Sequence, residues 1–213
     1  MTGRRAVRAE ILKLLSLPAT YCTVLGAIGA SAVLAIAFSR QGVSPVGYTQ
    51  AGFIVLGVIA ATSEYGDGQI HLTLIAMPRR IAQHLAKMAA LLIVSVPAAI
   101  FTVSAGLLVA GGPWSAAVGA SAYLALTAVL SAAVATVSRR SVPAMAGLLG
   151  YYFIVGPLLR DRVTFAAYLP DAAGHDLVAI GGPIVVLGWA LVVLGWALVA
   201  VGFSATMFRL RDA

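Results

Sequence analysis

The longest uncharged segment of this chain, residues 88–138, reads MAALLIVSVPAAIFTVSAGLLVAGGPWSAAVGASAYLALTAVLSAAVATVS. A helix that crosses the hydrocarbon core of a bilayer needs about 20 apolar residues. The segment is more than twice that length, and only Gly111, Gly112 and Pro113 interrupt it near its centre. It therefore predicts two membrane-spanning helices joined by a tight turn.

The composition of the whole chain agrees with a membrane protein. Of its 213 residues, 61% are hydrophobic and 10% are charged, whereas ordinary soluble domains carry about 25% charged residues. Four further windows lack any charge, namely residues 14–39, 41–63, 141–159 and 177–208. We therefore expect one all-α membrane domain over residues 1–213, with six transmembrane helices at about residues 18–39, 43–62, 86–110, 114–137, 142–159 and 180–204.

The basic residues indicate the orientation of these spans. With six spans, eleven of the fourteen lysines and arginines fall on one side of the membrane, and the other side holds Arg40, Arg160 and Arg162. Lysine and arginine concentrate in cytoplasmic segments, so we expect both termini in the cytoplasm. Arginine outnumbers lysine twelve to two and alanine is abundant, a bias that favours a GC-rich bacterial genome. We therefore expect the protein in a bacterial plasma membrane. No basic stripe with interleaved aromatic residues is present, so the net charge of +7 does not indicate nucleic-acid binding.

Residues 4–17 have the pattern of an amphipathic helix that lies along the membrane surface. Val7, Ile11, Leu14 and Leu15 fall on one face of such a helix. Pro18 then marks the bend into the first span. A basic flank that only sets the orientation of the chain is the alternative interpretation. The charged residues of the interfacial helix are Arg4, Arg5, Arg8, Glu10 and Lys13.

The segment between the second and third spans, residues 63–84, is expected on the cytoplasmic side. Gly66 and Gly68 permit a sharp turn directly after the second span. Asp67 is suited to cap a short helix that begins near Gly68, because its carboxylate accepts hydrogen bonds from free backbone N–H groups.

Within that short helix, Ile70, Leu74 and Met77 are spaced i, i+4 and i+7, which makes one apolar stripe. Arg79 and Arg80 follow the stripe. The spans on either side already anchor the segment, so the stripe predicts contact with a cytoplasmic partner. A helix that rests on the lipid surface is the alternative.

The order Ser-Glu-Tyr-x-x-Gly-x-Ile over residues 63–70, Pro-Arg-Arg over 78–80 and Ala-Lys over 86–87 resembles the membrane permease subunit of type-2 ABC exporters. In that family a Glu-Tyr/Phe-x-x-Gly-Thr-Ile core precedes a coupling helix that docks on the nucleotide-binding subunit, and here Gln69 stands where threonine is frequent. The long outer loop over residues 160–179 is similar to the partly re-entrant outer helices of the family. The resemblance implies an ATPase-docking surface made of Glu64, Tyr65, Gly68, Ile70, Leu74, Met77, Arg79 and Arg80.

The resemblance also implies partners and an energy source. The family works as two permease subunits, identical or related, that face each other across a substrate path. Both lysines of this chain, Lys13 and Lys87, lie outside any Gly-x-x-x-x-Gly-Lys-Ser/Thr phosphate loop. ATP and Mg²⁺ are therefore expected on a separate ATPase subunit, with no cofactor on this chain. The apolar spans favour a hydrophobic or amphipathic cargo, such as a drug, a peptide or a lipid-like molecule. A membrane anchor or regulatory subunit without transport is the alternative.

An enzyme is disfavoured by the placement of the reactive side chains. His71, His84 and His175 all lie outside the predicted spans, and no carboxylate lies inside one. Neither a His-Glu-x-x-His metal site nor a buried proton relay is therefore indicated. We expect no catalytic residue and no metal ligand on this chain.

Small and aromatic residues inside the spans suggest how the helices pack. Small residues let membrane helices approach closely, which predicts contacts at Gly26, Ala30, Gly147 and Gly188. Tyr151 and Tyr152 are interpreted as packing aromatics or as part of the belt at the membrane interface.

The predicted topology can be tested with a reporter that is active only in the cytoplasm. Fused after Ala213 or inserted near Gly66, the reporter should be active, and near Gly42 or Gly174 it should be silent. Activity near Gly174 would contradict the sixth span.

Overall fold

The computed structural model describes residues 3–38, 46–66, 80–110, 114–160, 162, 168–171 and 183–211. Over these ranges the regular structure is helical and contains no strand, which confirms an all-α fold. The helices are α1 (Gly3–Ser16), α2 (Pro18–Phe38), α3 (Val46–Gly66), α5 (Arg80–Ala110), α6 (Ser115–Ser138), α7 (Ser141–Gly150), the π-helical turn η1 (Tyr151–Val155), α8 (Gly156–Arg160) and α10 (Pro183–Arg211).

Within the part of the chain that the structure describes, five helical segments are long and apolar enough to cross a membrane, and they correspond to the first five predicted spans. These segments are Pro18–Phe38, Val46–Ser63, Ile81–Ala110, Ala117–Ser138 and Ser141–Arg160. Helix α10 has 29 residues, but its apolar stretch among the described side chains, Leu191–Met207, is shorter than a full span. The sixth span therefore stays a prediction.

The described helices extend into both ends of the predicted cytoplasmic segment, residues 63–84. Helix α3 continues to Gly66, and α5 begins at Arg80, so helical structure takes both ends of the expected coupling segment. The predicted third span begins at residue 86, next to Lys87, but a charged side chain does not break a helix. Gln83, His84 and Lys87 are all buried within the first turns of α5, so this helix continues past its apolar stretch.

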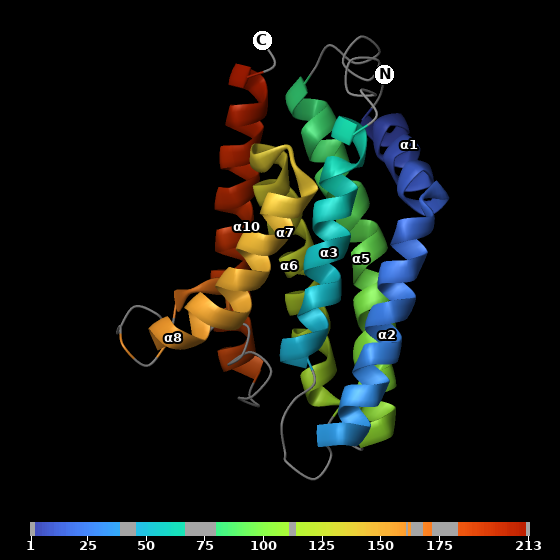
Figure 1. Cartoon of the computed structure of the whole chain (residues 1–213), viewed down its shortest axis with the longest axis vertical. Helices are drawn as coiled ribbons and strands as arrows, with labels where there is room; N and C mark the ends of the chain where they lie inside the picture. The colour runs from blue at the N-terminus through green and yellow to red at the C-terminus, as the bar shows by residue number, and fades with distance from the viewer. Residues whose placement is uncertain are drawn as a thin grey trace.

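The helices form a bundle, and the short helix α1 lies obliquely beside it near one end (Figure 1). Figure 1 shows α1 and the C-terminal end of α10 at the same end, with α8 at the opposite end. Helix α6 packs against α3, α5 and α10, whereas α2 packs against α3 and α5. Helix α1 packs against α5. The two ends are called the α1 end and the α8 end below.

A tight corner at the α1 end turns the chain from α6 into α7. Arg139 adopts a left-handed conformation with φ 56°, and its N–H bonds to the carbonyl oxygen of Ala135 at 2.8 Å. A left-handed residue with this backward bond is a common way to end a helix. The adjacent Arg140 is extended, and α7 starts at Ser141.

The centre of the bundle is the contact between α3 and α6. A Cβ atom added to Gly57 would lie 2.1 Å from the backbone oxygen of Ala128 and 3.0 Å from Cβ of Ser131. The two backbones therefore touch without an intervening side chain, and Phe53, Ile54 and Leu124 are fully buried around this contact. Close approach through small residues maximises van der Waals contact where lipid removes the hydrophobic drive for association.

The glycines at which neighbouring helices approach closely differ from those that the sequence suggested. A Cβ at Gly52 would lie 2.9 Å from Cβ of Ala27 in α2, whereas one at Gly26 or Gly147 would meet nothing within 4 Å. The expectation of close contacts at Gly26 and Gly147 is wrong, because both lie on helix faces that no neighbouring helix approaches. The side chain of Gly188 lies outside the described residues.

Gly57→Ala should destabilise the bundle by about 1–3 kcal/mol, because the new methyl group forces two backbones apart. Gly147→Ala is the matched control, since its methyl group enters open space in a helix that prefers alanine to glycine. Equilibrium unfolding in mixed detergent micelles measures both changes. Equal stability of the two variants would contradict the α3–α6 contact.

Candidate functional site

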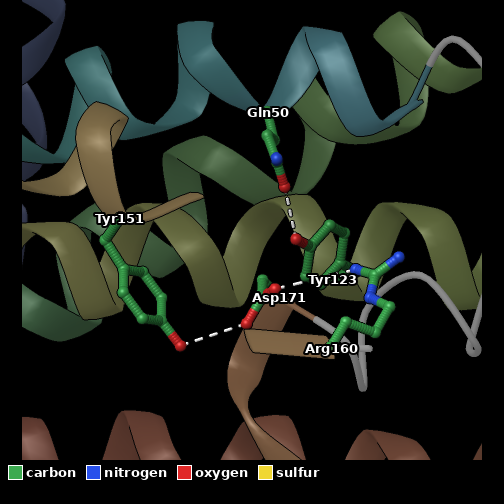
Figure 2. A network of polar contacts seen from close by, with 5 residues as sticks. All are labelled: Gln50, Tyr123, Tyr151, Arg160 and Asp171. Atoms are coloured by element: carbon green, nitrogen blue, oxygen red, sulfur yellow. Dashed lines mark hydrogen bonds and ion pairs between the residues drawn. The ribbon is translucent and has the colours of Figure 1, made fainter. Parts of the chain in front are cut away.

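The main group of buried polar side chains lies toward the α8 end of the bundle. It joins Gln50 of α3, Tyr123 of α6, Tyr151 of η1, Arg160 of α8 and Asp171 of the short segment 168–171. Figure 2 shows the five side chains converging from these separate elements. We call them the tyrosine–aspartate cluster.

Asp171 is the charged centre of this cluster and is only 5% exposed. The hydroxyl of Tyr151 donates a hydrogen bond to its Oδ1 atom at 3.0 Å. Nη2 of Arg160 lies 3.6 Å from Oδ2, which is an ion pair but too long for a hydrogen bond. Among the described residues, Oδ2 has no hydrogen-bond partner. One carboxylate oxygen thus accepts a hydrogen bond, whereas the other has only the ion pair with Arg160.

The second contact in the cluster connects the two central helices. The Tyr123 hydroxyl donates a hydrogen bond to Oε1 of Gln50, and both residues are buried. The buried ring of Tyr152 meets the ring of Tyr151 edge-on, with centroids 5.3 Å apart and an interplanar angle of 87°. An edge-to-face arrangement is favourable for aromatic rings, so Tyr151 is held in place while its hydroxyl binds Asp171.

Segment 168–171 is also tied to the last helix. Nε1 of Trp196 in α10 donates a hydrogen bond to the backbone oxygen of Tyr168 at 2.8 Å. Asp171 at the other end of the segment is held by η1 and α8. The segment therefore bridges α10 and the η1–α8 region.

Polar residues are also buried toward the α1 end, between α5 and α10. Nε2 of His84 and Oγ of Ser204 lie 2.9 Å apart, and the Ser204 hydroxyl donates to the backbone oxygen of Val201 at 3.0 Å. With its hydrogen so used, Ser204 Oγ accepts from the His84 ring. Gln83 and Lys87 are buried on the same helix, and Oε1 of Gln83 has no hydrogen-bond partner in the described structure.

These arrangements fix helices and segments relative to one another. Among the described residues, no three His, Cys, Asp or Glu side chains lie close enough together to hold a metal ion. Cys22 is a free, exposed thiol on α2. In the tyrosine–aspartate cluster, a phenol group and a guanidinium group hold one carboxylate.

The residues of the predicted interfacial helix are placed on α1 largely as expected. Arg4, Arg5 and Arg8 are exposed, whereas Glu10 and Lys13 are half-buried. Leu14 is buried against the bundle core with Val7 and Ile11 beside it. Leu15, on the same predicted apolar face, is 41% exposed, and Leu12 is 59% exposed. Helix α1 packs mainly against α5, and these two leucines lie outside that contact.

The predicted docking residues lie mostly outside the described residues. Glu64 and Tyr65 occupy the last turn of α3, and Arg80 is the first residue of α5. The other predicted docking residues, Gly68, Ile70, Leu74, Met77 and Arg79, fall in the range 67–79 that the structure does not describe.

The sequence patterns give no indication of the tyrosine–aspartate cluster. They place Asp171 in an outer loop without a role and favour belt or packing positions for Tyr151 and Tyr152. Tyr151 and Asp171 are 20 positions apart, with no periodic pattern to connect them. The available signal was a Tyr-Tyr pair inside a short span, followed by an acidic residue next to Pro170.

Over its described residues the chain is all-helical, with five helices long and apolar enough to cross a membrane. A scan of protein-family models finds none that matches the chain, and a search of curated proteins finds no matching relative.

Tyr123→Phe should lower the free energy of unfolding by about 1 kcal/mol, because it leaves the buried Gln50 Oε1 without its donor. Tyr48→Phe is the control, since the Tyr48 ring stacks on Phe38 and is 47% exposed. Unfolding in mixed micelles measures both variants. A Tyr123→Phe protein as stable as the control would contradict the α3–α6 hydrogen bond.

Proposed function

We propose that this chain is the transmembrane subunit of an ATP-driven exporter of the type-2 ABC class. In this proposal α10 is a sixth span, and both termini lie in the cytoplasm of a bacterial cell. A separate nucleotide-binding subunit that holds ATP and Mg²⁺ drives the transport. The cargo is a hydrophobic or amphipathic molecule.

The observation that carries the proposal is the set of elements that meet at the α1 end. Helix α1, the C-terminal end of α3, the start of α5, the α6–α7 corner and the C-terminal end of α10 all lie there (Figure 1). Arg139 and Arg140 stand at that corner, and exposed arginines stand on α1. Such a concentration of basic residues is typical of a cytoplasmic side, and the motif that resembles the exporter family begins at the same end.

The central packing supports a transport path between two chains. Helices α3 and α6 touch through Gly57 and Ala128 at the centre of the bundle. A cargo that passes through the middle of one chain would have to separate these backbones. A path between two copies, or between this chain and a related one, leaves the contact intact. The dimer expected from the family resemblance fits this arrangement.

The exposed apolar surface supports a bilayer environment and an apolar cargo. Large hydrophobic side chains such as Leu25, Ile36, Phe101, Val142 and Leu198 are each at least 60% exposed. A soluble protein rarely exposes so many large apolar side chains to this extent. A membrane anchor or regulatory subunit shares this surface, so the distinguishing property is the docked ATPase and its activity.

Leu74→Asp should abolish co-purification of an ATPase subunit, because Leu74 is the centre of the predicted apolar stripe. Loss of such an anchor costs about 2 kcal/mol or more, which is about thirtyfold in affinity. Leu72→Asp is the matched control, since position 72 falls on the opposite face of the predicted helix. Glu64→Ala should leave the complex assembled but lower its transport-linked ATPase activity.

The measurement is the ratio of ATPase to permease after affinity purification from the native host, compared at equal membrane expression. Full ATPase retention by Leu74→Asp would overturn the docking assignment. An ATPase-free preparation of the unaltered chain would favour the anchor or regulatory role.

A further inference from the structure

The π-helical turn η1 aligns the residues that hold Asp171. In this turn the N–H of Gly156 bonds to the carbonyl oxygen of Tyr151, five residues earlier. Residues five apart therefore stack along the helix at this point. Arg160 follows Gly156 by four residues, which places it on the same face of α8. Tyr151, Gly156 and Arg160 thus form one row.

An uninterrupted α-helix would not make this row. Each α-helical residue turns the chain by about 100°, so a spacing of five leaves two side chains about 140° apart. Tyr151 would then point away from the face that carries Gly156 and Arg160. Single π turns are uncommon and occur frequently at functional positions. Here the turn brings together the two side chains that contact one carboxylate.

Gly156 completes a socket for that carboxylate. A Cβ atom at Gly156 would lie 2.3 Å from Oδ2 and 2.7 Å from Cγ of Asp171. The carboxylate therefore rests directly on the helix backbone, in space that any other residue would fill. We call Tyr151, Gly156 and Arg160 the Asp171 socket.

The hold of this socket on Asp171 is incomplete. One oxygen accepts the Tyr151 hydrogen bond, while the other is 3.6 Å from Arg160 without a hydrogen bond. The Arg160 side chain is 36% exposed, so solvent or lipid headgroups can compete for it. At its other end the segment remains bonded to Trp196 of α10, which gives it an attachment when Asp171 leaves.

The geometry points to a conformational switch: segment 168–171 is a strap that closes on the Asp171 socket, and the π turn decides whether the socket exists. Conversion of η1 to α-helix leaves Gly156 and Arg160 about 140° around the helix from Tyr151. The row is then broken and Arg160 moves away from the carboxylate. The strap separates from η1 and α8 but stays bonded to Trp196 of α10. This device is a property of the chain and does not depend on the transport function proposed above.

A cysteine pair tests the closed position of the strap. Cγ of Asp171 is 2.7 Å from the Cβ position of Gly156. Cβ of Asp171 is one C–C bond of about 1.5 Å from this Cγ, so it lies at most about 4.2 Å from the Gly156 Cβ position. It also lies at least 3.2 Å away, because Oδ1 at 3.2 Å is the third-nearest atom and Cβ is not among the nearest three. Disulfides need Cβ atoms about 3.5–4.5 Å apart.

In a Cys22→Ala background, Gly156→Cys with Asp171→Cys should form a disulfide under mild oxidation, seen as loss of maleimide labelling. Gly150→Cys with Asp171→Cys is the matched control and should stay reduced, because a Cβ at Gly150 has nothing within 4 Å. A reduced 156–171 pair, or equal cross-linking of both pairs, would overturn the closed position.

Hydrogen–deuterium exchange of the purified chain tests the switch. Asp171→Asn and Tyr151→Phe should each raise exchange over residues 152–160 by about tenfold, because each removes a charge-assisted contact that holds the π turn. Tyr48→Phe is the control at the same end of the bundle and should leave exchange there unchanged.

Deletion of Ile154, an exposed residue of η1, separates the switch from a simple tether. The deletion shortens the spacing between Tyr151 and Gly156 to four residues, so Tyr151, Gly156 and Arg160 share one face of a regular α-helix. The socket then persists, and no π turn remains that could convert to α-helix. In this background Asp171→Asn should no longer raise exchange. An equal rise in both backgrounds would overturn the role of the π turn.

Discussion

The direct contact between Gly57 of α3 and the Ala128 backbone of α6 is the constraint on which the rest of the bundle depends. It sets the separation of the two central helices, and the helices α2, α5, α7 and α10 pack around this pair. In a bilayer, apolar side chains gain little by leaving lipid for a helix interface. Dispersion between closely fitting backbones and small side chains then becomes a main source of stability.

Buried polar groups are handled in two ways in this bundle. Several hydroxyls bond back to their own helix, as Thr62 does to the Val58 oxygen and Thr102 to the Ala98 oxygen, both at 2.8 Å. Such bonds satisfy a polar group locally and specify no partner helix. The contacts Gln50–Tyr123, His84–Ser204 and Asp171–Tyr151 instead connect different elements. These few contacts select particular neighbours among otherwise similar apolar surfaces.

The two ends of the bundle differ in how firmly their elements are attached. Helix α1 is anchored to α5 by the buried Ala6 and Leu14. The strap at the other end is held by two hydrogen bonds and one long ion pair. Local opening is expected where buried apolar contacts are few. Among the described elements, the η1–α8 region is accordingly where we expect a change of shape to cost least.

The sequence alone determined the class of the fold, because transfer of a helix into lipid depends mainly on the summed hydrophobicity of about 20 consecutive residues. The uncharged runs therefore predicted the five helices that are long and apolar enough to cross a membrane, and the periodicity of Val7, Ile11 and Leu14 predicted α1. The ends of the helices were predicted less accurately. Helix α5 begins at Arg80, before the uncharged run that starts after Lys87, because helical hydrogen bonds do not require apolar side chains. Tertiary structure decided which residues meet. Gly57, rather than Gly26 or Gly147, lies against another backbone, and Asp171 is buried by side chains of η1 and α8. The 120 positions between His84 and Ser204 leave no local pattern, because such pairings are set by helix rotation and packing in three dimensions.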